Sequence, residues 1–156
     1  MGDRVLHRIL LVLTLIGIGI ASYLTYVHYE GLSPICAVGH GCEKVQSSQW
    51  AKVGGVPVPL IGLVGYVGLL GSLLVRGELA RLATAGMAYI GVAFSAYLTY
   101  RELFSIHAIC QWCVGSAIVM TLIAIFATIR VLRAPEFELG DDDAPTLHAD
   151  LEHEPA

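Results

Sequence analysis

Four cysteines fall into two pairs whose spacings suit thiol–disulfide chemistry. Cys110 and Cys113 are two residues apart, and an uncharged apolar stretch runs from 114 to 129. A cysteine pair that opens a helix places one thiol beside unpaired backbone N–H groups, which stabilise a thiolate. Cys36 and Cys42 lie in a polar segment that contains glycine. The sequence therefore predicts a relay, in which disulfides are exchanged between the two pairs.

Two other roles for the cysteines have to be weighed against a relay. Structural disulfides would staple one face of the protein, but a bond between Cys110 and Cys113 closes a very short loop and stabilises little in the chain-entropy description. The spacing of this pair favours redox chemistry, whereas Cys36 and Cys42 taken by themselves fit either role. A zinc site with four cysteine ligands is disfavoured by the five residues between Cys36 and Cys42, so no metal site is predicted.

The composition indicates a membrane protein. Of the 156 residues, 56% are hydrophobic and 14% are charged, against about 25% charged in soluble domains. Each of four apolar segments is close to the ~20 residues that cross ~30 Å of hydrocarbon; they are 9–27, 58–75, 82–100 and 109–129. We therefore predict an all-α integral membrane protein, a four-transmembrane-helix bundle with a large extracytoplasmic loop between its first two helices. The sparse charge argues against a nucleic-acid partner.

The distribution of basic residues predicts the orientation. Six arginines lie at the N-terminus, in the turn at 76–81 and at 130–133, whereas the opposite side holds Lys44, Lys52 and Arg101. Because Lys and Arg collect on the cytoplasmic side, both termini should be cytoplasmic and all four cysteines should lie on the outer face. Residues 1–134 form the membrane domain in this interpretation. The acidic stretch 135–156 has little to bury and is predicted to be a disordered cytoplasmic tail.

Two packing features are also predicted. Small residues on one helix face let membrane helices approach closely, and glycine recurs at every third position of the second span, at Gly62, Gly65, Gly68 and Gly71. In the loop, residues 43–52 can form a short interfacial helix that turns Val45 and Trp50 toward lipid.

The chain resembles the vitamin K epoxide reductase family, in its bacterial form without a fused thioredoxin-like domain. The resemblance covers residues 9–133. It rests on the order of the two cysteine pairs, with the C-x-x-C at the fourth span, and on three sequences: CEKVQSSQW at 42–50, GVPVPLIG at 55–62 and CQWC at 110–113.

The resemblance implies a quinone-dependent thiol–disulfide oxidoreductase of the bacterial cytoplasmic membrane. Cys113 would meet a quinone of the menaquinone or ubiquinone type, with Ser48 and Trp50 at the same site. Cys110 would exchange with Cys42, and Cys36 with a separate extracytoplasmic thioredoxin-fold protein, which is thereby reoxidised and supports disulfide formation.

Two alternatives stay open. One is a non-enzymatic membrane scaffold with structural disulfides. The other is a quinone or epoxide reductase that works in the vitamin K direction. The animal branch of the family carries a tyrosine four residues after its second active-site cysteine, where this chain has Ala117, which weakens the prediction of epoxide reduction.

Overall fold

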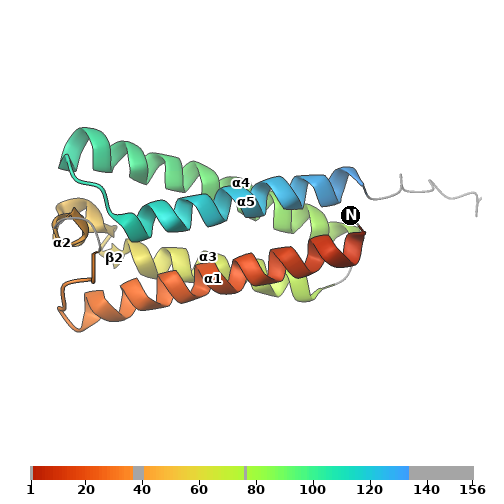
Figure 1. Cartoon of the computed structure of the whole chain (residues 1–156), viewed down its shortest axis with the longest axis horizontal. Coiled ribbons are helices and arrows are strands. Elements are labelled where there is room, and N and C mark those ends of the chain that lie inside the picture. Colours follow the sequence, from red (N-terminus) through yellow and green to blue (C-terminus); the bar gives the residue numbers. More distant parts are fainter. Residues whose placement is uncertain (1, 37–40, 76, 134–156) are drawn as a thin grey trace, which may run out of the picture.

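The computed structural model describes residues 2–36, 41–75 and 77–133. The predicted tail at 135–156 lies outside these ranges. Within them, four long helices lie side by side in an elongated bundle (Figure 1). They are α1 (Asp3–Tyr29), α3 (Val58–Leu74), α4 (Glu78–Arg101) and α5 (Gln111–Leu132). Figure 1 also shows that the short elements between α1 and α3 gather at one end, opposite the N-terminus.

In the part of the chain that the structure describes, three helices are long and apolar enough to cross a membrane. They are α1, α4 with its continuation to Ile106, and α5. The apolar helix α3 has 17 residues and, at ~1.5 Å per residue, is about 26 Å long. The fold is therefore that of a helical membrane protein, with α3 shorter than the other three helices.

Local sequence explains where α3 and α4 begin and end. Pro59 lies in the first turn of α3, where a missing N–H breaks no helical hydrogen bond. Helix α4 passes directly into a wider π-helical turn, η2 (Glu102–Ile106). His107 ends that turn in the left-handed region, with φ of 53°. The widened turn matters for function because its first residue, Glu102, is buried beside the cysteines.

The loop between α1 and α3 folds into several short elements. They are α2 (Gly41–Gln46), the 3-10 turn η1 (Gln49–Ala51) and a hairpin of β1 (Lys52–Val53) and β2 (Val56–Pro57). The hairpin is antiparallel, with Val53 opposite Val56. Gly54 and Gly55 connect its strands with φ of 59° and 85°, the conformation for which a two-residue hairpin turn selects glycine.

The interfacial helix predicted for 43–52 is wrong. Helix α2 ends at Gln46, and the Ser48 hydroxyl donates a hydrogen bond of 2.7 Å to the Val45 carbonyl. A serine that bonds to nearby backbone in this way competes with helix continuation. Val45 is only 9% exposed and packs against cysteines, and Trp50 is half-buried. Both side chains thus belong to the interior of the loop region and do not face lipid.

The core runs along the middle of the bundle and includes hydrogen bonds between helices. Tyr66 of α3 is fully buried, and its hydroxyl lies 3.1 Å from the Ser116 carbonyl oxygen and 3.0 Å from the Ser116 hydroxyl on α5. The Ser72 and Thr84 hydroxyls are 2.8 Å apart and join α3 to α4. Such bonds hold apolar helices together where lipid offers no hydrophobic driving force between them.

One of the four glycines in the α3 stripe makes the expected close helix contact, since a methyl group added at Gly68 would overlap the end of the Met87 side chain on α4. A methyl group added at Gly62, Gly65 or Gly71 would meet no atom within 4 Å. Gly62 and Gly65 instead line a cavity described below. The tightest approach between helices is at Gly17 of α1, where an added methyl would overlap the ring of Tyr66.

Gly17→Ala is therefore expected to destabilise the bundle by about 1–3 kcal/mol, the usual range for overpacking a core. The Tyr66 ring is buried and tied to Ser116, so it cannot move aside. Gly91→Ala is the matched control, because the atoms nearest to its added methyl belong to the flexible Met120 side chain and not to a rigid ring. Thermal unfolding in detergent should show a clearly larger loss of stability for Gly17→Ala than for Gly91→Ala. Equal losses would contradict this account of the contact.

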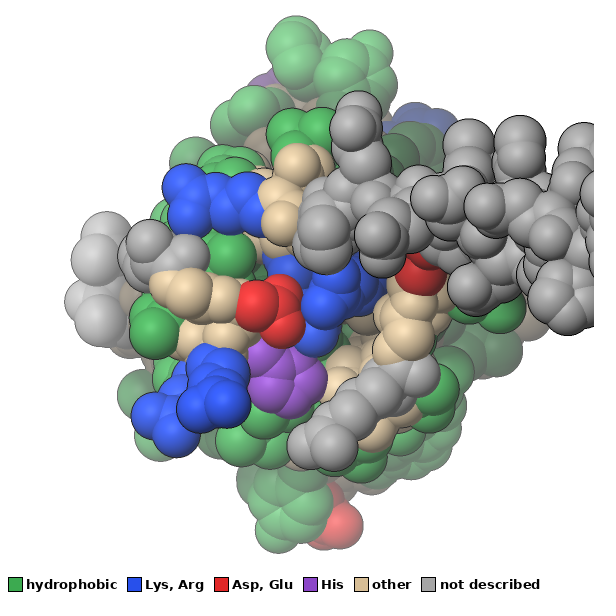
Figure 2. Space-filling view, turned by 90° about the vertical axis from the view of Figure 1, so that its right-hand side faces the viewer, with side chains coloured by type: hydrophobic (Ala, Val, Ile, Leu, Met, Phe, Trp, Pro, Cys, Tyr) green, Lys and Arg blue, Asp and Glu red, His purple; other side chains and the backbone are tan. Residues whose placement is uncertain are grey.

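Ion pairs link three helices at the N-terminal end of the bundle. Asp3 of α1 lies 3.0 Å from Arg130 of α5 and 3.6 Å from Arg81 of α4. Figure 2 shows basic side chains gathered on this end of the molecule, around acidic and histidine side chains. The Asp3 side chain is 52% exposed, so these pairs contribute little stability.

Candidate functional site

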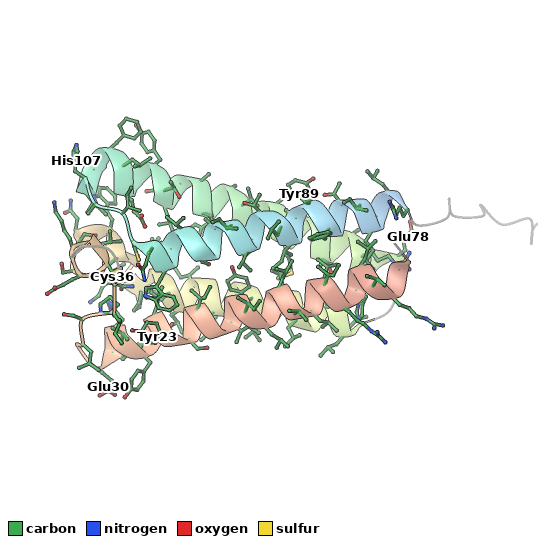
Figure 3. All side chains as sticks on the ribbon, viewed as in Figure 1. Tyr23, Glu30, Cys36, Glu78, Tyr89 and His107 are labelled. Carbon is green, nitrogen blue, oxygen red and sulfur yellow. A yellow bond between two sulfur atoms is a disulfide. The ribbon has the colours of Figure 1, made fainter. Side chains whose placement is uncertain are left out.

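All four cysteines meet at the opposite end of the bundle. Figure 3 labels Cys36 and Tyr23 there, beside the loop elements. Cys42 and Cys110 form a buried cluster with Val45, and Cys36 and Cys113 pack against it. Cys42 and Cys110 are 68 residues apart in the chain. The fold thus assembles in one place the residues that the sequence predicted to exchange.

The two pairs are in different states. Cys36 and Cys42 form a disulfide, with Cα atoms 6.3 Å apart, whereas Cys110 and Cys113 are free thiols. Cys42 is 1% exposed and Cys110 is fully buried. Cys36 and Cys113 are half-buried. Cys42 and Cys110 therefore form the centre of the shared cluster, and Cys36 and Cys113 lie at its margins.

The backbone of Gly41 brings the two pairs together. Helix α2 begins at Gly41, and a methyl group there would overlap the carbonyl oxygen of Ile109. The residues that follow these two are Cys42 and Cys110. A direct contact between the two backbones thus places Cys42 beside Cys110, and only glycine permits it.

Aromatic side chains fix the backbone next to Cys36. The Ile35 N–H donates to the Tyr23 hydroxyl at 3.0 Å, and the Ile35 carbonyl accepts from the indole N–H of Trp112 at 2.8 Å. The Tyr23 and Trp112 rings pack together with centroids 4.9 Å apart. The Ile35 side chain itself is 76% exposed. Cys36 is consequently held at the surface of the cluster, where a protein from solution can approach it.

Cys110 is the N-cap residue of α5 and carries the better stabilised thiolate. The hydrogen bond from the Cys113 thiol is the main cause that lowers the pKa of Cys110, and the backbone N–H groups of Cys113 and Trp112 act in the same direction. Burial and the charge of Glu102 oppose this shift without cancelling it. The sequence had placed a thiolate at this helix N-terminus, and the structure assigns it to Cys110.

Cys113→Ala is expected to raise the pKa of Cys110 toward the ordinary thiol value, because the variant removes the hydrogen bond that lowers it most. If Cys36 and Cys42 are also replaced by serine, Cys110 is the remaining thiol of the variant and has no disulfide to attack. The ultraviolet absorbance of the thiolate can then be titrated against pH. A pKa of Cys110 equal to that in the matched protein with Cys113 intact would contradict the assigned cause.

Glu102 is a site residue that sequence reasoning missed. Its side chain is only 4% exposed, and its Oε2 accepts a hydrogen bond of 3.1 Å from the Cys110 N–H. The carboxyl group also interacts with the Cys113 thiol. The available signal was an acidic residue at the end of an apolar span, eight positions before Cys110. Beside Arg101, however, Glu102 has the pattern of an ordinary charged helix flank.

A cavity of about 390 Å³ lies within the bundle beside Cys113. All four long helices contribute to its mostly apolar wall, and the volume is in the range of small-molecule sites. Cys113, Ser48, Trp50 and Glu102 line it. Arg101 lies 4.0 Å from the centre of the Trp50 ring and donates a hydrogen bond to the Tyr97 hydroxyl at 3.2 Å. The predicted cofactor-binding residues thus share one cavity wall. In the described ranges, no group of three or more His, Cys, Asp or Glu side chains is placed to hold a metal ion.

Comparison with known protein families agrees with the pattern of the site. The model of the Vitamin K epoxide reductase family matches residues 8–128, which include all four cysteines. The chain belongs to this family. The match also includes Ser48, Trp50 and Glu102, so the whole cavity wall described above lies within the vitamin K epoxide reductase domain.

This chain is also similar to a plant protein, the thiol-disulfide oxidoreductase LTO1 of Arabidopsis thaliana. The two are 31% identical over 129 residues. The aligned part is 75% of this chain and 34% of the plant protein. The chain therefore spans about a third of the length of that relative.

Proposed function

We propose that this protein is a quinone-linked thiol–disulfide oxidoreductase of a membrane. Electrons pass from a thiol partner to Cys36 and Cys42, then to Cys110 and Cys113, and finally to a quinone. The observation that carries the proposal is the arrangement of the four cysteines in one cluster, with Cys113 on the wall of the cavity. The plant relative is named a thiol-disulfide oxidoreductase, which supports the same chemistry.

The exchange between the pairs follows from their placement. After a partner has reduced the Cys36–Cys42 disulfide, the Cys42 thiolate attacks Cys110 of an oxidised Cys110–Cys113 pair, and the Cys113 thiolate leaves. Cys36 then attacks Cys42 and releases Cys110 as a thiolate, which its lowered pKa favours. Two electrons have moved inward, one disulfide has been broken and one has been formed.

The cavity supports a quinone as the final acceptor. Cys113, Ser48 and Trp50 would hold a quinone of the menaquinone or ubiquinone type in the mostly apolar space between the helices. The Cys110–Cys113 dithiol gives two electrons and two protons to that substrate and returns to a disulfide. A scaffold function is less well supported, because Cys110 and Cys113 are free thiols in a buried cluster and do not staple anything.

The partner and the location complete the proposal. The half-buried Cys36, next to the exposed Ile35, suits attack by a separate thioredoxin-fold protein outside the membrane. The arginines near Asp3, at the other end of the bundle, support a cytoplasmic position for the termini. We place the protein in a bacterial cytoplasmic membrane, with the cysteines on the outer face.

Reconstitution tests this function directly. The full chain in vesicles that contain a menaquinone or a ubiquinone should transfer electrons from a reduced thioredoxin-fold protein to the quinone, followed by quinone absorbance and by loss of partner thiols. Both signals should change in a ratio of one quinone to one dithiol. Vesicles without quinone are the control. Oxidation of the partner that proceeds equally without quinone would refute the proposed acceptor.

A further inference from the structure

Glu102 is a buried carboxyl group whose position calls for a function. Charged side chains are costly inside a membrane protein, and those that are present usually serve a function. Glu102 lies at the start of the π-helical turn η2, with 4% of its surface exposed. Its oxygens contact the Cys110 backbone N–H and the Cys113 thiol, and its side chain lines the cavity. It thus touches both the active pair and the space next to Cys113.

On this basis, and resting on the quinone-linked function proposed above, we propose that Glu102 is the base that accepts the Cys113 proton when the dithiol is oxidised. Cys113–SH and Glu102–COO⁻ become Cys113–S⁻ and Glu102–COOH. The two thiolates, Cys110 and Cys113, then form their disulfide and release two electrons to the quinone. The reduced quinone takes up two protons. One proton comes from Glu102–COOH, which returns to the carboxylate. The other proton comes from solvent and balances the proton that Cys110 lost to solvent when it became a thiolate.

The geometry favours a base over a simple anchor. If Glu102 only held the start of α5 in place, it would need no more than one oxygen to accept the hydrogen bond from the Cys110 N–H, and its Oε2 does so at 3.1 Å. The same carboxyl group also meets the Cys113 thiol. Cys113 lines the cavity together with Glu102, so a proton taken from that thiol stays on the wall where the substrate would lie. In this mostly apolar space, a fixed acceptor replaces water for the proton transfer.

The other charged groups near Glu102 are accounted for. The adjacent Arg101 directs its guanidinium to the rings of Trp50 and Tyr97. From the α5 side, Glu102 faces the thiols of Cys110 and Cys113. Helix α2 packs against η2, and it contributes the disulfide-bonded Cys42 and the neutral Gln46, while Glu43 and Lys44 are exposed. Among the residues that the structure describes, the titratable groups in contact with Glu102 in the site are therefore the two thiols.

Glu102→Gln separates the two roles. The amide oxygen can still accept the hydrogen bond from the Cys110 N–H, but the amide cannot take a proton from Cys113. In vesicles at neutral pH, quinone reduction by the prereduced variant should be about a hundredfold slower than in the wild type, the lower end of the usual effect of a general base. The rate should rise tenfold per pH unit, as solvent base replaces Glu102. The matched control is Glu43→Gln, an exposed glutamate on α2, which should keep the wild-type rate.

A second readout needs no quinone. With Cys36, Cys42 and Cys110 replaced by serine, alkylation of Cys113 by iodoacetamide reports its thiolate. If Glu102 accepts the proton, the alkylation rate has a plateau between the two protonation steps of the Glu102–Cys113 pair. In the same background, Glu102→Gln should give a single rise of unit slope up to the thiol titration. If Glu102→Gln does not fold, Glu102→Asp should retain a plateau at a different height.

The outcomes are distinguishable. The same alkylation profile with and without the carboxyl group, or a Glu102→Gln rate of quinone reduction within twofold of the wild type, would overturn the assignment of the base. That result would leave the quinone-linked function standing. Failure of the wild type to reduce quinone would instead refute the proposed function, and the alkylation profile would still decide whether Glu102 takes the proton.

Discussion

Cys113→Ser abolishes electron transfer to quinone, with a loss of about three orders of magnitude or more, as expected when the reacting group of a covalent step is removed. Cys113 is the cysteine on the cavity wall, so no other thiol is placed to complete the reaction there. Serine is preferred to alanine because its hydroxyl can still donate to the Cys110 sulfur and keep that thiolate reactive. The rate is measured in quinone-containing vesicles with a reduced thioredoxin-fold protein as donor.

The same variant should accumulate a diagnostic disulfide. The Cys110 thiolate attacks Cys42 in the Cys36–Cys42 disulfide and releases Cys36. In the absence of the Cys113 thiol, no group on α5 can attack Cys110 and break the new Cys42–Cys110 disulfide. Mass spectrometry of unreduced peptides should find Cys42 joined to Cys110, and Cys36 open to alkylation. Thr121→Ser, an exposed change on the same helix, is the control and should show neither effect. A Cys113→Ser protein that keeps turning over would exclude the proposed order of transfer.

The cysteine spacing and the apolar segments carried most of the information in this sequence. The C-x-x-C at 110–113 predicted a helix start with a stabilised thiolate, because N-terminal N–H groups act within one turn of the chain. Its partner pair could be found because cysteine is rare and chemically specific. The assignment of Ser48 and Trp50 to the same site rested on resemblance to a family, since each is unremarkable by itself.

What sequence reasoning missed depends on contacts between distant segments. Glu102 resembles any helix-flanking charge until η2 turns it inward onto Cys110. The regular glycine spacing of α3 suggested close helix packing, but a stripe of small residues can equally leave room for a cavity, as Gly62 and Gly65 do. Which of the two occurs depends on the side chains that face the stripe from other helices, and a single sequence does not specify them.

Gly41 is the clearest case of a residue whose importance appears only in three dimensions. In the sequence, Gly41 is one of the glycines of the polar segment around Cys36 and Cys42, and nothing marks it as a contact residue. In the structure, Gly41 is the first residue of α2, and its backbone lies against the Ile109 carbonyl. The position is helical and its φ is not positive, so glycine is required there by space and not by backbone conformation.

Gly41→Ala is therefore expected to slow exchange between the two pairs by about a hundredfold, the cost of moving reacting groups by roughly 1 Å. The added methyl would overlap a backbone oxygen, which cannot rotate away as a side chain can, so Cys42 and Cys110 must separate. Quinone reduction by a prereduced Cys110–Cys113 pair should be nearly unchanged, because Cys113, Glu102 and the cavity are not touched by the added methyl.

The two steps can be measured separately in stopped-flow experiments. Oxidation of reduced Cys36 and Cys42 by the Cys110–Cys113 disulfide is followed by quenching and thiol labelling, and quinone reduction is followed by absorbance. Gly86→Ala, a helical glycine of α4 with no atom within 4 Å of an added methyl, is the matched control for helix propensity. Loss of both steps in Gly41→Ala would indicate general disruption of the site. A normal rate of exchange would show that the contact between Gly41 and Ile109 does not govern the relay. Selective loss of exchange would show that this backbone contact positions the two cysteine pairs for exchange.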